Sequence, residues 1–238
     1  MTLLDIFIIL FILLCVIGGF KRGIIKETVS IVGLIIIFVI AFIFKEQLGN
    51  ILCKFLPFIP LKGSLEGLVS INILIYQSLA FVIIFGLLSS IYMIVVKLSS
   101  VLQKLVNFTL VLLLPSKIGG AVVAGLKGYL LTFVVLIAVM VPFKDINMIS
   151  ESTIANKILY NTPVLSKSTG SITNSISEIY TLGDKLSKEE LTTNEANLET
   201  IDIMLKYKVV SKKTVEQLVV LDKLKEVKGI NKVLEKYE

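Results

Sequence analysis

Two long apolar runs at the start of the chain are separated only by a short basic turn. The runs cover residues 3–20 and 24–44, and the turn between them reads Gly-Gly-Phe-Lys-Arg-Gly over residues 18–23. The hydrocarbon core of a bilayer is about 30 Å thick, and an α-helix needs about 20 apolar residues to cross it. The pattern therefore predicts two membrane spans joined as a helical hairpin.

Lys21 and Arg22 in this turn predict the direction of insertion. Basic loops next to membrane spans are retained on the cytoplasmic side, so the turn is expected inside and the N-terminus outside. A secretory signal peptide has its basic residues before the apolar run. Residues 1–5 contain no basic residue, so the first run is interpreted as a span.

Two further apolar runs, over residues 68–96 and 118–143, bring the predicted number of spans to four. Residues 45–67 are expected to form a loop because they contain Pro57 and Pro60. Polar residues recur at three- and four-residue steps over 97–108, which predicts an amphipathic helix at the interface. The alternative is that this segment extends the third span.

The predicted fold class is all-α: a polytopic membrane helical bundle over residues 1–143 and an extramembrane helical tail over 144–238. In the tail, Ser187 is expected to begin one helix and Ser211 another that continues to about Val227. Four crossings return the chain to its starting side, so both termini are expected outside a bacterial inner membrane.

Charge is distributed unevenly between these two parts. Residues 1–143 contain ten basic and four acidic residues, whereas 144–238 contain fourteen of each. The net charge of +6 therefore lies in the membrane part, where it serves topology. A nucleic-acid-binding protein would instead carry a basic patch on its soluble part, so no nucleic-acid partner is expected.

The chain contains no histidine, and this excludes several classes of enzyme. Ser-His-Asp and Cys-His catalysis and HExxH zinc sites all require histidine. An intramembrane hydrolase would lack a base to activate Ser89 or Ser90. We therefore expect no catalytic residues, no metal and no cofactor.

Small residues recur at helical spacing in the fourth run. Gly120, Ala124 and Gly128 are four residues apart, Gly125 lies on an adjoining row, and Gly19 and Gly23 have the same spacing. Such residues allow helix backbones to approach closely. They predict either an interface between copies in a homo-oligomer or close packing within one bundle.

Lys127 is the only charged residue inside the fourth run. It lies eight residues after Gly119, about 12 Å along a helix. An ionisable group at such a depth is a functional candidate, although a lysine can also extend its amine to the headgroups. We hypothesise that Lys127 pairs with Glu27, which lies near the same membrane surface.

These residues together resemble the colicin V production protein family. The similarity rests on Asp5 before an apolar run, the Gly-Phe-Lys-Arg-Gly turn at 19–23 and the following run with Gly33. It continues with Lys-Ile-Gly-Gly at 117–120, Gly-Leu-Lys-Gly at 125–128, and a stretch from Ser150-Glu151-Ser152 to Thr162-Pro163. It covers about residues 1–165, and the remaining tail departs from the family core.

The resemblance implies a multi-pass inner-membrane protein linked to toxin production or export and to envelope homeostasis. Its expected partners are the lipid bilayer and other membrane or envelope proteins. Two functions remain open: a non-enzymatic scaffold or accessory factor, and a small oligomeric channel or transporter. In the second, Lys127 and the polar residues Asn72, Gln77 and Asn107 would lie near a pathway.

Overall fold

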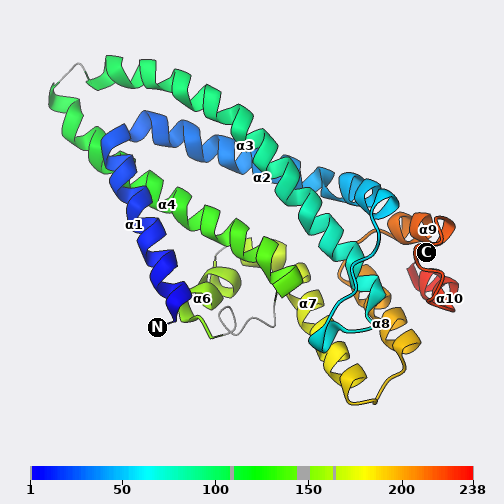
Figure 1. Cartoon of the computed structure of the whole chain (residues 1–238). Helices are drawn as coiled ribbons and strands as arrows, with labels where there is room; N and C mark the ends of the chain where they lie inside the picture. The colour runs from blue at the N-terminus through cyan, green and yellow to red at the C-terminus, as the bar shows by residue number, and fades with distance from the viewer. Residues whose placement is uncertain (1, 108–109, 144–150, 163–164, 238) are drawn as a thin grey trace. The chain divides into compact units, whose positions relative to one another are not determined.

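The computed structural model describes residues 2–107, 110–143, 151–162 and 165–237 (Figure 1). Within these residues the regular structure is entirely helical, which confirms the predicted all-α class. The helices are α1 Leu3–Arg22, α2 Ile24–Phe55, η1 Gly63–Leu65, η2 Val69–Ile71, α3 Asn72–Asn107, α4 Leu110–Phe143, α6 Thr153–Asn161, α7 Leu165–Ser187, α8 Thr193–Lys206, α9 Lys212–Val220, α10 Ile230–Leu234 and η3 Glu235–Tyr237.

Four helical stretches of the described residues are long and apolar enough to cross a membrane, as predicted. They are Leu3–Arg22, Ile24–Phe55, Val69–Ile94 and Pro115–Val139. Large apolar side chains such as Phe7, Leu87 and Val122 point outward from these helices. An exposed surface of this extent is unfavourable in water and is suited to lipid.

The helix ends differ from the predicted ones in three places. α2 continues to Phe55 because the first proline after residue 44 is Pro57. α3 continues unbroken through Asn107, so 97–107 extends the third helix, which is the alternative named above; Phe108 lies outside the described residues. α4 begins at Leu110 and contains Pro115, because membrane helices tolerate proline.

The helices form two compact units, each assembled from segments that are far apart in the sequence. Unit 1 contains Met1–Ile43 and Val82–Thr162, and unit 2 contains Phe44–Phe81 and Pro163–Glu238. This division differs from the predicted boundary between 143 and 144. The end of α2, the following loop and the first turns of α3 belong with the tail because their polar and apolar side chains pack against it.

In unit 1, α1 lies alongside α4, and α6 contacts both of them (Figure 1). Buried apolar side chains on α1, α2 and α4 of this unit include Ile8, Leu34, Ile37, Phe133, Val134 and Leu136. α1 begins with a capping box, in which Thr2 accepts from the backbone of Asp5 and the Asp5 carboxylate accepts from the backbone of Thr2. The backbone N–H groups of Thr2 and Asp5, at the start of the first span, therefore both have hydrogen-bond partners.

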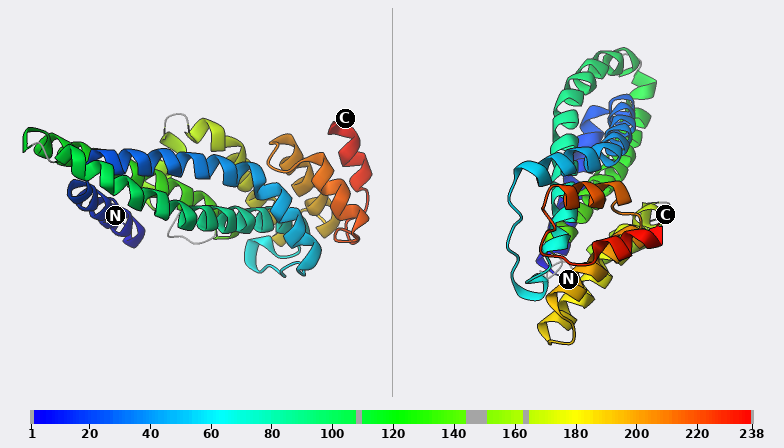
Figure 2. Two further views of the ribbon diagram at one scale, coloured as in Figure 1. Left: turned by 90° about the horizontal axis from the view of Figure 1, so that it is seen from above. Right: turned by 90° about the vertical axis from the view of Figure 1, so that its right-hand side faces the viewer.

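In unit 2, α7 and α8 pack side by side, as the yellow and orange helices in Figure 2 show. η1 packs on α7 and η2 on α8. Gly183 permits the first contact, because an added Cβ would overlap the carbonyl oxygen of Ser64. The loop after α2 is therefore part of the core of this unit.

Two predicted helix ends in the tail were wrong. Ser187 ends α7, and the capping box that begins α8 is formed by Thr192 and Glu195. Ser211 does cap α9, but this helix ends at Val220 and not near Val227. Asp222 has a φ of 55°, a left-handed conformation that terminates helices.

Candidate functional site: a charged cavity in unit 1

Glu27 is the centre of the charged cluster in unit 1. Its side chain is 1% exposed and lies between two cations. Arg22 Nε is 2.5 Å from Oε1, and Lys127 Nζ is 2.5 Å from Oε2. The structure thus brings together the two residues of the hypothesised pair. Arg22, considered above only for topology, is a second partner that sequence spacing did not reveal.

The turn between the first two helices positions these charges. Gly23 has a φ of 84°, which only glycine adopts readily, and it lets α2 begin directly after α1 ends. Arg22 lies in the last turn of α1 and Glu27 in the first turn of α2. Each charge is favourable at its helix end, because the macrodipole is negative at the C-terminus and positive at the N-terminus.

Lys127 reaches this cluster from the middle of α4. Its side chain is 12% exposed, and Nζ also donates to Ser30 Oγ at 3.2 Å. The amine is therefore turned toward the interior of unit 1. Two partners in a poorly solvated site offset part of the cost of burying the charge.

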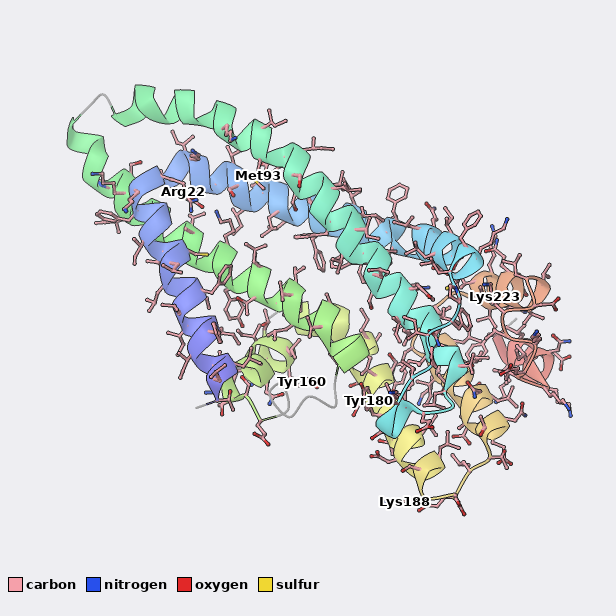
Figure 3. All side chains as sticks on the ribbon, in the orientation of Figure 1. Arg22, Met93, Tyr160, Tyr180, Lys188 and Lys223 are labelled. Atoms are coloured by element: carbon pink, nitrogen blue, oxygen red, sulfur yellow. The ribbon has the colours of Figure 1, made fainter. Side chains whose placement is uncertain are left out.

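A cavity of about 370 Å³ adjoins the cluster. Its charged lining residues are four cations and one anion: Arg22, Lys26, Lys97, Lys127 and Glu27. Its apolar lining residues are Leu34, Ile37, Met93 and Leu131. Two of the lining residues are labelled in Figure 3: Arg22 at the end of α1 and Met93 on α3. The cavity therefore combines a net positive charge with an apolar lining.

Tyr92 also lines the cavity, and no local sequence pattern indicated it. Its hydroxyl donates to the carbonyl oxygen of Val29. Its ring lies against α2 at Gly33, where an added Cβ would overlap the ring. The glycine noted in the family resemblance is thus required for the contact between α2 and α3.

The small residues of α4 lie against α1. An added Cβ on Gly19 would overlap Ala124 and Gly120, and one on Gly120 would approach Gly23. A Cβ on Gly125 would lie 3.1 Å from Val16, and one on Gly128 would lie 3.0 Å from Cys15. These residues form a close helix contact within one chain, which is the second of the two arrangements considered above.

Asp5 is at the opposite end of α1 and is fully buried. Its Oδ1 accepts from Ser152 Oγ at 2.5 Å and from the Ile154 backbone at 2.9 Å. Its Oδ2 accepts from the Thr2 backbone at 2.8 Å. Ser152 also caps α6. The Asp5 carboxylate therefore links the N-terminus of α1 to the N-terminus of α6, which is a structural role.

The other predicted polar residues have different positions. Asn72 donates to Ile59 and Val69 carbonyl oxygens inside unit 2. Gln77 accepts from Lys45 Nζ at 2.8 Å, also inside unit 2. Lys21 is exposed, and the side chain of Asn107 lies outside the described residues. In the described part of the chain, no three His, Cys, Asp or Glu side chains are placed to hold a metal ion.

Unit 2 contains a second cavity, of about 510 Å³, with balanced charge. Its charged lining residues are three acids and three lysines: Glu178, Glu199, Asp202, Lys185, Lys206 and Lys236. Glu178 accepts from Tyr207 Oη and pairs with Lys206 at 3.2 Å. The Tyr207 hydrogen bond, followed by Lys206, holds the pKa of Glu178 below its ordinary value.

Comparison with known proteins gives one match. No curated protein and no solved structure is significantly similar to the chain. The family model described as colicin V production protein matches residues 4–163. This range includes the Glu27 cluster, the α1–α4 contact and the Asp5–Ser152 link, and it confirms the resemblance inferred from the sequence. The chain belongs to the colicin V production protein family.

Proposed function

We propose that this protein is a non-enzymatic accessory factor of the bacterial inner membrane that supports the production or export of a peptide toxin and helps to maintain the cell envelope. The match to the colicin V production family over residues 4–163 carries the proposal. Four helices able to span a membrane support the location. The lack of histidine in the sequence supports a role exerted through membrane partners rather than through acid–base catalysis.

The proposed topology has both termini outside. The loop between the second and third spans packs with the tail in one unit, which supports placing this loop and the tail on the same side of the membrane. This requires an even number of crossings between them, in agreement with the third and fourth spans. The basic turn at 21–22 supports the assignment of the opposite side to the cytoplasm.

Cysteine labelling tests this topology. Cys15 and Cys53 are replaced by serine, and single cysteines are introduced at Lys62, Lys188 or Lys21. A membrane-impermeant maleimide added to intact spheroplasts is expected to label positions 62 and 188, and to label position 21 only after lysis. The reverse pattern would refute the orientation while keeping the four spans.

Gene deletion in the native bacterium tests the function. Loss of the protein is expected to reduce secretion of a co-expressed peptide toxin and to raise sensitivity to detergent and osmotic stress. A plasmid copy should restore both properties. Unchanged secretion and stress tolerance in the deletion strain would refute the proposed role.

A second candidate function, a small channel or transporter, is supported by the cavity around Lys127. In that case a cysteine at position 127 should react with impermeant thiol reagents. Gln77 provides a second test position, because it is one of the polar residues expected to lie near the pathway of a channel. Complete protection of both positions would count against a pore.

A further inference from the structure

We propose that the cavity in unit 1 binds an anionic phospholipid, with its phosphate group at the basic wall and an acyl chain along the apolar wall. The proposal requires that the chain is inserted in a membrane. It does not depend on the role in toxin production. Its ligand class follows from the charge, the apolar lining and the volume of the cavity.

The charge of the wall selects for an anion. Four cationic side chains and the single carboxylate of Glu27 line the cavity, which leaves a net formal charge of +3. Arg22 and Lys127 both contact Glu27, and Lys26 and Lys97 add two further positive charges to the lining. Basic pockets between membrane helices are binding sites for acidic headgroups.

The apolar lining favours a lipid over a free anion. Leu34 and Ile37 follow Lys26 on α2, and Leu131 follows Lys127 on α4. Leu34 lies eight residues after Lys26, about 12 Å along the helix, which matches the step from a headgroup to an acyl chain. A volume of about 370 Å³ is at the lower end of the usual range for ligand sites, so it can enclose the headgroup and the first part of one chain.

The proposed orientation places this cavity toward the leaflet that carries such lipids. Arg22 and Lys26 flank the turn assigned to the cytoplasmic side. Anionic lipids give the cytoplasmic surface of the membrane its negative potential. The site is thus within reach of phosphatidylglycerol or cardiolipin by lateral diffusion.

Fluorescence quenching can measure the lipid preference directly. The natural chain has no tryptophan, so a Met93→Trp variant places a single reporter on the cavity wall. The purified full-length variant is reconstituted in phosphatidylcholine vesicles that contain brominated phosphatidylglycerol or brominated phosphatidylcholine. We expect phosphatidylglycerol to bind the site about thirtyfold more strongly, because two lysine charges at about 1 kcal/mol each provide about 2 kcal/mol.

Two matched double variants test the site. Lys26→Gln with Lys97→Gln removes two charges from the cavity wall, and the preference should disappear. Lys21→Gln with Lys117→Gln removes two basic residues that do not line the cavity, and the preference should persist. Circular dichroism and size-exclusion chromatography establish that each variant is folded, and native mass spectrometry of the chain without the reporter counts retained lipids independently.

Three results would overturn the proposal. The first is equal quenching by the two brominated lipids in the Met93→Trp parent. The second is an equal loss of preference in both double variants, which would indicate general attraction to a charged surface. The third is displacement of the lipid signal by inorganic phosphate at constant ionic strength, which would assign the cavity to a soluble anion.

Discussion

The Glu27 cluster makes an asymmetric prediction about stability. Glu27→Leu leaves the Lys127 amine, whose side chain is 12% exposed, with Ser30 as its remaining described partner. Removing one member of a buried ion pair costs about 3–5 kcal/mol, and we expect a loss of that size. Lys127→Leu leaves Glu27 paired with Arg22 at 2.5 Å, so its cost should be about 2 kcal/mol, the value of one charged hydrogen bond.

The double variant should be more stable than Glu27→Leu alone. It removes both buried charges and leaves Arg22, whose side chain is 41% exposed and can turn to water or headgroups. Replacing a buried pair by apolar residues is often nearly neutral. Because the two single costs sum to about 5–7 kcal/mol, a nearly neutral double variant corresponds to a coupling free energy of about that size.

Unfolding in mixed micelles measures these free energies. The folded protein in mild detergent is titrated with sodium dodecyl sulfate, and helix content is followed by circular dichroism. Lys117→Leu is the matched control, because Lys117 lies in the same helix over the ring of Phe20 and should lose less than about 1 kcal/mol. A coupling below about 0.5 kcal/mol, the usual limit of additivity, would refute the cluster as a stabilising unit.

Three further predictions concern other contacts. Gly33→Ala should cost about 1–3 kcal/mol because its methyl group meets a tyrosine ring, whereas Gly86→Ala, with open space around it, should be neutral or stabilising; equal effects in micelle unfolding would contradict this. Asp5→Ala should lose about 1–2 kcal/mol with the hydrogen bonds that its carboxylate accepts from Thr2, Ser152 and Ile154, and an unchanged unfolding curve would refute it. Because the pKa of Glu178 is lowered in the folded protein, its interactions stabilise the fold at pH values above the ordinary glutamate pKa. This stabilisation is lost as the pH falls through the lowered pKa. Tyr207→Phe should therefore destabilise the protein at neutral pH but not in acid, and a pH-independent difference in thermal unfolding would contradict this.

The sequence was sufficient to predict the number and approximate position of the membrane helices. Continuous apolar runs and basic turns depend only on local composition, so they are visible without a structure. The pairing hypothesis for Glu27 and Lys127 also came from composition, because each is an isolated charge near one membrane surface. The structure places their atoms 2.5 Å apart.

Other features depend on contacts between distant segments and could not be read from local patterns. Arg22 was interpreted as a topology signal because its position in the turn gave no indication that it contacts Glu27. Tyr92 was indistinguishable from any aromatic residue in a span, and its role depends on Gly33 of another helix. Glu46 was expected in a loop, but it caps α9 by accepting from the Ser211 backbone at 3.1 Å.

The Glu46 contact also explains why the tail and the loop after α2 belong to one unit. The Glu46 carboxylate lies at the N-terminus of α9, where backbone N–H groups favour an anion. Asn50, one turn further along α2, donates to Thr214 Oγ1 at 2.9 Å and to Gln217 Oε1 at 3.2 Å. These contacts are polar and specific, whereas an apolar docking surface would tolerate several registers. The tail therefore attaches to α2 in one orientation, although the family model ends at residue 163.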